Sequence, residues 1–258
     1  MTNRVCIASQ RGGVGKTSLA VNLARSLVEV GQSVLLVDTD PQASATWWMG
    51  QDVSRALAEA LADGSPLEPG VIPTTSGVAL VPSSGLVLSK AARVLAGEPG
   101  AELALRKALD GLPEKWDWTI IDTPPDIGGL LSVGALASSR SILVPVTPDP
   151  GGLGGIAGVL HVAGQVRDRL NPELGEELFL LSRVDHARVA WEAEEELRKL
   201  FGKRVLKDTI PQRVAVREAW GARKALLDYD RRSDASEAFL SVAQDVLARH
   251  TNRTGRRV

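Results

Sequence analysis

The stretch Ser9-Gln10-Arg11-Gly12-Gly13-Val14-Gly15-Lys16-Thr17-Ser18 decides the fold of this chain. It follows the short apolar run of residues 5–8 and precedes an amphipathic run over residues 19–27. A strand, a glycine-rich loop and a helix are therefore predicted in that order. Residues 10–17 nearly satisfy the phosphate-binding pattern G-x-x-x-x-G-K-[S/T], except that Gln10 occupies the first glycine position. The glycines stand at positions 12, 13 and 15 instead, which indicates a variant of that loop.

The residue types of this loop suit a phosphate chain. Its three glycines allow positive φ and a close approach of the backbone to the anion, and successive N–H groups converge on it at a helix N-terminus. Lys16 is expected to add a full charge on the phosphates, and the Thr17 hydroxyl is expected to bind Mg²⁺. A ligand-free βα turn is the alternative, which the Lys-Thr pair after the last glycine disfavours. The predicted phosphate-binding residues are Gly12, Gly13, Val14, Gly15, Lys16, Thr17 and Ser18.

Composition limits the class of protein. The formal charge of −1 over 258 residues argues against a globally basic nucleic-acid binder, although it leaves room for a local basic patch. One cysteine, Cys6, excludes a disulfide framework or a cysteine-based metal or iron–sulfur site within one chain; we expect it in the core. With no signal-peptide pattern and no apolar run long enough to span a membrane, a cytoplasmic protein is expected.

Strands and helices alternate along the chain, and most predicted strands are continuous apolar runs. This pattern predicts an α/β fold with a doubly wound, mostly parallel sheet flanked by helices. Residues 63–75 read as a Gly/Pro-rich connection, residues 1–250 as a single domain, and residues 251–258 as a disordered basic tail. The predicted strands are 5–8, 34–37, 78–82, 116–122, 141–146, 178–182 and the edge-like 209–211; the predicted helices are 19–27, 43–60, 86–95, 102–109, about 155–170, 191–201 and 236–250.

Acidic residues end two of the predicted strands. Asp38 and Asp40 follow residues 34–37, and Asp122 ends the strand at 116–122. Because ligands bind at the carboxyl ends of parallel strands, Asp122 is predicted to organise Mg²⁺, usually through water. Asp38 and Asp40 would face alternate sides of an extended chain, one toward the metal and one toward an attacking water. The alternative is that these acids only cap the helices that follow.

Together these stretches resemble the ParA/MinD branch of deviant-Walker P-loop ATPases, most closely the short, Soj-like ParA proteins. The resemblance runs from Val5 to about Ala248. Five stretches carry it: Arg11 to Thr17; Val34 to Gln42; Asp117 to Pro125; Pro145 to Asp149; and Ile210-Pro211 with Glu218-Ala219 and Tyr229-Asp230.

The resemblance implies ATP and Mg²⁺ as cofactors and a homodimer that forms on ATP binding with two nucleotides between the subunits. It implies weak intrinsic ATP hydrolysis, with Asp40 positioning or activating the water. Thr17 and Asp122 would hold Mg²⁺, with Asp38 in support. Four residues would lie against the adenine: Arg183, Asp185, Pro211 and Gln212.

Arg11 is the one departure within the loop. The family has a lysine there that reaches the partner's phosphates across the dimer. Arginine keeps the charge and adds a planar fork that binds two oxygens. We expect Arg11 to act in catalysis together with Lys16 and Asp40, as an arginine finger in trans; a tolerated basic residue on the rim is the alternative.

The resemblance also implies that the protein binds a surface and that ATP hydrolysis sets how long it stays bound. Non-specific DNA is the favoured ligand, with a ParB-like protein or an adaptor stimulating hydrolysis and the nucleoid as the location of the ATP-bound form. The alternative is that the basic residues of the C-terminal part belong to an ordinary solvated face, since the same region also contains Glu192, Glu194, Glu195 and Glu196. The candidate DNA-binding residues are Arg188, Arg213, Arg217, Arg223, Lys224 and Arg231.

Other roles fit the sequence less well. A MinD-like membrane ATPase needs a terminal amphipathic helix with a free apolar face, whereas Phe239, Val242, Val246 and Leu247 are expected in the core. Metal- or redox-linked relatives need paired cysteines. A partner-regulated ATPase switch that does not bind DNA also remains open. Trp47 and Trp48 are expected to pack in the core.

Overall fold

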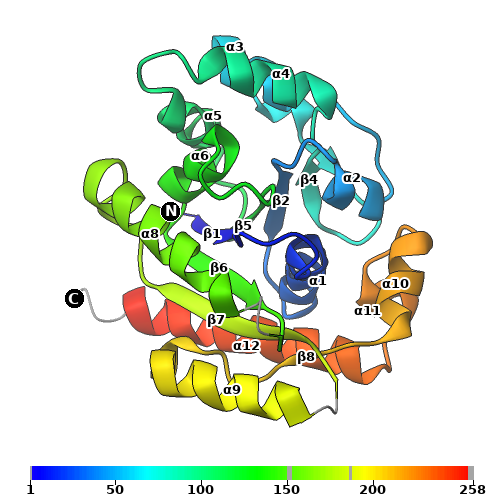
Figure 1. Ribbon diagram of the computed structural model, residues 1–258. Helices are drawn as coiled ribbons and strands as arrows, with labels where there is room; N and C mark the ends of the chain where they lie inside the picture. The colour runs from blue at the N-terminus through cyan, green and yellow to red at the C-terminus, as the bar shows by residue number, and fades with distance from the viewer. Residues whose placement is uncertain (1, 150–152, 186–187, 255–258) are drawn as a thin grey trace.

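One eight-stranded sheet, in the order β3-β4-β2-β5-β1-β6-β7-β8, forms the middle of the molecule (Figure 1). The computed structural model describes residues 2–149, 153–185 and 188–254. Every neighbouring pair is parallel except β3 and β4, so the predicted fold class is confirmed. The strands are β1 (Asn3–Ile7), β2 (Val34–Asp38), β3 (Ile72–Pro73), β4 (Ala79–Val81), β5 (Trp118–Asp122), β6 (Ser141–Val146), β7 (Glu177–Val184) and β8 (Ile210–Pro211).

Helices cover both faces of this sheet, as Figure 1 shows. The α-helices are α1 (Lys16–Glu29), α2 (Ser44–Trp48), α3 (Ala56–Asp63), α4 (Leu86–Leu95), α5 (Ala104–Asp110), α6 (Leu130–Ser138), α8 (Ile156–Arg169), α9 (Arg188–Phe201), α10 (Val214–Gly221), α11 (Leu226–Tyr229) and α12 (Asp234–Thr254). Short 3₁₀ turns occur at η1 (Glu68–Gly70), η2 (Ala101–Leu103) and η3 (Gly202–Arg204).

The central strands send alternate side chains into two cores. In β1, Val5 and Ile7 join the core beneath α1 and α12, whereas Cys6 joins the core beneath α3, α5, α6 and α8. The same alternation separates Ile120 from Ile121 in β5. Both faces are buried, which is why these strands read as continuous apolar runs rather than as alternating patterns. Cys6 is fully buried, as expected.

Two segments differ from the sequence prediction. The helix expected over 43–60 is divided into α2 and α3, because the chain turns at Gly50, which adopts a φ of 75°. The connection expected over 63–75 contains η1 and the edge strand β3, which pairs antiparallel with β4. β3 has only two residues and ends on Pro73, so it gave no periodic signal.

Three helices carry no prediction from the sequence. α6 is rich in small apolar residues and lacks a polar face, whereas α10 and α11 are only eight and four residues long. At the other end of the chain, α12 continues through Thr254, beyond the predicted boundary at residue 250. The remainder of the predicted tail, residues 255–258, lies outside the described residues. Phe239, Val242 and Val246 are buried, as expected, and Leu247 is partly buried against the same core.

His250 links α12 to the N-terminal ends of β5 and β6. Its ring lies edge-on to the buried Trp118, with the ring centroids 4.6 Å apart. Its Nδ1 lies 2.9 Å from the Val246 carbonyl, which only accepts, so Nδ1 carries a proton. Nε2 lies 2.8 Å from the Ser141 hydroxyl on β6. One side chain thus joins the last helix to two strands.

Replacing this side chain should loosen α12. We expect His250→Ala to lower the free energy of unfolding by about 2 kcal/mol, because it removes a buried ring contact and leaves the Ser141 hydroxyl without this partner. Denaturant unfolding followed by far-UV circular dichroism would measure the change. His161→Ala is the matched control, since His161 is exposed on α8. Equal stabilities for the two variants would contradict this role.

Candidate functional site

Parallel register brings the glycine-rich loop and two acids to one edge of the sheet. Ile7 at the end of β1 is the register partner of Asp122 on β5, and Asp122 is in turn the partner of Asp38 on β2. The loop starts directly after β1 and leads into α1. The spacing in sequence therefore becomes proximity at the carboxyl end, as expected for an open parallel sheet.

The loop depends on glycine at two positions. Gly13 has a φ of 77° and Gly15 has a φ of 94°, a region that L side chains rarely adopt. Gly15 is the N-cap of α1, and its carbonyl accepts the first helical bond from Leu19 N at 2.8 Å. The helix therefore begins at Lys16, and its free N–H groups lie at the loop.

The end of β7 supports this loop from the side. Ser182 Oγ donates to the Val14 carbonyl at 2.8 Å, and Arg183 Nη1 donates to the Gly13 carbonyl at 2.5 Å. Arg183 itself adopts a φ of 58°. These bonds hold two loop carbonyls, so the guanidinium of Arg183 stabilises the loop in this structure. The predicted contact of Arg183 with adenine stays a prediction.

Lys16 lies within the loop with only 7% of its surface exposed. Its Nζ donates to the Arg11 carbonyl at 3.3 Å. Burial lowers the pKa of Lys16, while the negative charges of Asp122 and Asp40 act in the opposite direction. The ammonium group thus lies between the Arg11 carbonyl and the carboxylates of Asp122 and Asp40, whose negative charge it offsets.

Asp122 is fully buried, and neither carboxylate oxygen has a hydrogen-bond partner among the described residues. Burial raises the pKa of Asp122 well above its usual value. The neighbouring Asp38 charge raises it further, whereas the nearby Thr17 hydroxyl and Lys16 act against the rise. A buried carboxylate without partners is costly, so this position suits a cationic ligand.

Asp38 is also fully buried, but its oxygens are occupied. Oδ2 accepts from the Thr46 backbone N at 2.8 Å and from Thr46 Oγ1 at 2.7 Å, and Oδ1 accepts from the Asp40 backbone N at 3.1 Å. Burial raises the pKa of Asp38 to about 6, although these hydrogen bonds oppose the rise. The geometry assigns Asp38 to positioning α2 and the Asp40 turn; its support of Mg²⁺ stays a prediction.

Asp40 reaches the cavity beyond the sheet edge. Its Oδ1 accepts from the Gln42 backbone N at 2.9 Å, and its carbonyl accepts from Ser83 Oγ at 2.7 Å. These bonds fix the turn after β2, and the carboxylate lines the same cavity as Lys16 and Thr17. Asp40 is thus placed where it could orient a water next to a phosphate.

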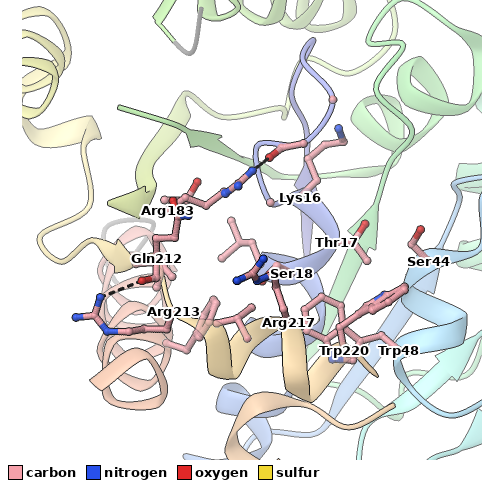
Figure 2. Close-up of a pocket in the computed structure, with 18 of the residues that line it drawn as sticks. Lys16, Thr17, Ser18, Ser44, Trp48, Arg183, Gln212, Arg213, Arg217 and Trp220 are labelled. Carbon is pink, nitrogen blue, oxygen red and sulfur yellow. Dashed lines mark hydrogen bonds between the residues drawn. The ribbon is translucent and has the colours of Figure 1, made fainter. Parts of the chain in front are cut away.

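This cavity has a volume of about 690 Å³ and opens over the N-terminus of α1 (Figure 2). The residues predicted for nucleotide binding and hydrolysis that line it are Gly12, Gly13, Gly15, Lys16, Thr17, Ser18, Asp40, Arg183, Pro211 and Gln212; two residues predicted for DNA binding, Arg213 and Arg217, line it as well. The lining does not include Val14, whose side chain is buried, or Asp185, which is exposed. Asp38 and Asp122 lie behind the lining at the sheet edge.

Arg11 lies on the rim of the loop, with 45% of its side chain exposed. Its Nη1 donates to Asp149 Oδ1 of the same chain, just after β6. A guanidinium that reached a second subunit would first have to leave this carboxylate. The cross-dimer role of Arg11 stays a prediction.

Most of the candidate DNA-binding arginines are paired within the chain. Arg188 pairs with Glu192 at 2.8 Å, Arg213 bonds to both oxygens of Asp234 at 2.9–3.0 Å, and Arg231 pairs with Glu29. Arg217 lines the cavity instead. Lys224 is exposed and makes no side-chain hydrogen bond or ion pair among the described residues. Lys224 is therefore an exposed candidate outside the cavity whose charge is not paired among the described residues.

The sequence did not assign Trp48, Trp220 or Ser44 to the site, yet all three line the cavity. Two adjacent tryptophans just after Asp40 were the available signal. Trp48 is buried as expected, and its Nε1 donates to the Lys224 carbonyl at 2.7 Å. The expectation for Trp47 is wrong: it is 45% exposed, and its ring packs against the Arg223 guanidinium, whose Cζ lies 4.1 Å from the ring centroid.

Comparisons with known proteins agree with this geometry. The model of a family described as an AAA domain matches residues 2–175. "Chromosome partitioning protein ParA" of Myxococcus xanthus is 34% identical over 257 residues, covering 98% of this chain and 90% of the relative. "Chromosome-partitioning ATPase Soj" of Thermus thermophilus is 36% identical over 247 residues, covering 95% and 96%. Cobyrinic acid a,c-diamide synthase of Mycobacterium smegmatis, solved with an ATP analogue and magnesium, has a TM-score of 0.83 at 27% identity, covering 98% and 96%.

The bond between Thr46 and Asp38 yields a prediction with a pH dependence. Thr46→Val removes the hydroxyl that donates to Asp38 and accepts from Ser83 N, so we expect a loss of roughly 2 kcal/mol in unfolding free energy at pH 8. This hydroxyl stabilises the charged form of Asp38, whose pKa is about 6. The loss should therefore be smaller at pH 5, where Asp38 is mostly protonated in the folded state.

Thr46→Ser keeps the hydroxyl and serves as the matched control. Urea unfolding of the two variants and the original chain at pH 5 and pH 8 would make the comparison. A Thr46→Val loss that is the same at both pH values would show that the hydroxyl does not act through the Asp38 charge.

Proposed function

The chain belongs to the ParA/Soj family of chromosome-partitioning ATPases, and on that premise we propose that it is an ATP-driven switch for partitioning DNA or positioning a cargo. ATP binding would join two copies into a dimer, the dimer would bind DNA without sequence preference, and hydrolysis to ADP and phosphate would separate the copies. A ParB-like protein or an adaptor would stimulate a slow intrinsic reaction.

The observation that carries this proposal is the buried carboxylate of Asp122, whose two oxygens lack hydrogen-bond partners in the described chain. It lies beside Lys16 and Thr17 at the start of α1. Removing both oxygens from water without partners is unfavourable unless a ligand restores the balance. A phosphate-bound divalent cation beside the loop would provide that balance.

Mg²⁺ fits the donors that are present. Mg²⁺ usually takes one or two carboxylates and completes its shell with phosphate oxygens and water. No group of three or more His, Cys, Asp or Glu side chains converges as a ready metal site within the described ranges. Asp122 and the Thr17 hydroxyl would hold the ion together with water and the nucleotide phosphates, where Mg²⁺ neutralises negative charge.

The remaining groups divide the work of hydrolysis. Lys16 and the N–H groups at the start of α1 would hold the phosphates. Asp40 would accept a hydrogen bond from the attacking water and orient it toward the terminal phosphate. Attack forms the new P–O bond as the bond to ADP breaks, and the proton of the water leaves with phosphate or solvent. Arg11 would add positive charge from the partner subunit once it leaves Asp149.

Two substitutions separate ATP binding from hydrolysis. We expect Lys16→Ala to abolish ATP binding and ATP-dependent dimerisation, because the variant lacks the charge that holds the phosphates. We expect Asp40→Ala to bind ATP and remain dimeric, with turnover reduced roughly hundredfold. Light scattering after size exclusion, together with phosphate release, would measure both. A Lys16→Ala chain that still dimerises on ATP addition would contradict the proposed role of ATP binding. Normal turnover by Asp40→Ala would contradict the role of Asp40 in hydrolysis.

DNA binding is a separate proposal that rests on surface charge. Because Lys224 is exposed and unpaired among the described residues, we expect Lys224→Ala to weaken ATP-dependent DNA binding equally for unrelated sequences. The slope of log affinity against log salt should fall by about 1 when one lysine–phosphate interaction is removed. Arg231→Ala is the control, because Glu29 already neutralises Arg231. Gel-shift titrations at several salt concentrations would measure both slopes.

The outcome also decides between classes of switch. If the ATP-bound original chain does not bind DNA even at low salt, a partner-regulated switch or a MinD-like surface ATPase becomes the better description. Against a membrane role, Phe239, Val242 and Val246 of α12 are already buried in the core. The described part of the chain contains no helix that is both long and apolar enough to cross a bilayer.

A further inference from the structure

The face of α10 that lines the cavity contains Arg217, a charged residue that is not paired within the described chain. Val216, Arg217 and Trp220 of α10, together with its N-cap Arg213, line the cavity. Their spacing of three, four and seven residues places them on one side of the helix. Figure 2 shows Arg217 reaching into the cavity toward the first turn of α1.

The lining of the cavity is strongly cationic. Lys16, Arg183, Arg213 and Arg217 contribute positive charge, and Asp40 is the one acidic residue among the described lining. The N-terminus of the 14-residue helix α1 adds partial positive charge at the same place. A concave surface of one sign attracts an anion of opposite charge.

Three of the four cations already have partners in the chain. Lys16 bonds to the Arg11 carbonyl at 3.3 Å, Arg183 to the Gly13 carbonyl at 2.5 Å, and Arg213 to Asp234 at 2.9 Å. The Arg217 side chain, by contrast, has no hydrogen bond and no ion pair in the ranges that the structure describes. Its five donors are therefore free to bind a ligand.

The surroundings of Arg217 indicate what kind of ligand fits. Trp48 and Trp220 bring flat aromatic rings to the cavity, and Leu180, Ile210 and Phe239 add apolar surface. A ligand that satisfies both features has an anionic chain and a planar, weakly polar ring. A nucleotide has both, whereas a DNA duplex is too wide to enter a cavity of about 690 Å³.

We propose that Arg217 is a nucleotide-binding residue that contacts the phosphate chain, and that α10 thereby forms a second wall of the ATP site opposite the glycine-rich loop. This proposal gives Arg217 a role different from the predicted one in DNA binding, and the test below separates the two roles. The inference rests on the proposed function, because it names a further residue of the same ATP site.

The test compares phosphorylated and unphosphorylated ligands. Binding of ATP, ADP and adenosine to the original chain, Arg217→Ala and Arg217→Gln would be followed by calorimetry. The intrinsic tryptophan fluorescence, to which Trp48 and Trp220 of the cavity contribute, would serve as a second readout. We expect both variants to bind ATP and ADP roughly tenfold more weakly, because they lack the charge-assisted hydrogen bond to the phosphates. Adenosine should bind all three proteins equally.

Arg232→Ala is the matched control, because Arg232 is an exposed arginine outside the cavity with no side-chain partner among the described residues. It should bind ATP as the original chain does. Since Arg217 is itself exposed, the variants should keep the original thermal midpoint, and glutamine preserves much of the side-chain length.

Unchanged ATP and ADP affinity in Arg217→Ala, or an equal loss for adenosine, would overturn the phosphate contact. A lower DNA affinity and salt slope in Arg217→Ala with intact ATP binding would return Arg217 to the DNA surface. If the original chain binds neither nucleotide, the proposed function fails together with this assignment, whereas intact binding by the original chain isolates the result to Arg217.

Discussion

The parallel pairing of β1, β5 and β2 is the constraint on which the rest of the site depends. It places the loop after Ile7, the carboxylate of Asp122 and the carboxylate of Asp38 on one edge. A shift of one residue in either register would turn these acids toward the opposite face of the sheet. The apolar alternation that fills both cores therefore also fixes the chemistry at the edge.

The edge concentrates charge that the protein itself balances only in part. Burial raises the pKa of both Asp38 and Asp122, so in each case the folded state favours the protonated acid more than the unfolded chain does. These shifts reduce stability as the pH rises from the ordinary range of a carboxylic acid toward the raised values. The Thr46 hydroxyl donates a hydrogen bond to Asp38, whereas the two carboxylate oxygens of Asp122 have no hydrogen-bond partner among the described residues. Such a residue is more useful to a ligand than to the fold.

The short helix α2 connects the acidic edge of the sheet to α10. Thr46 on α2 bonds to Asp38, and two residues later Trp48 bonds to the Lys224 carbonyl beyond α10. Trp47 packs against Trp220 at 6.5 Å and under Arg223. A short, packed helix therefore connects the Asp40 turn to α10. This is a contiguous contact path between the two walls of the cavity.

The sequence alone determined the loop, the buried strands and the acids that end them, because these depend on local properties: glycine geometry, apolar runs and residues adjacent in the chain. It also identified Lys16, Thr17 and Asp40, which line one cavity in the structure. Tertiary structure decided the partners of the arginines. Arg213 and Asp234 are 21 residues apart, Arg11 and Asp149 138, and Arg231 and Glu29 202, so no local pattern reveals that these charges are paired. The same holds for Trp47 and Arg217, since exposure and direction depend on which distant helix packs beside them.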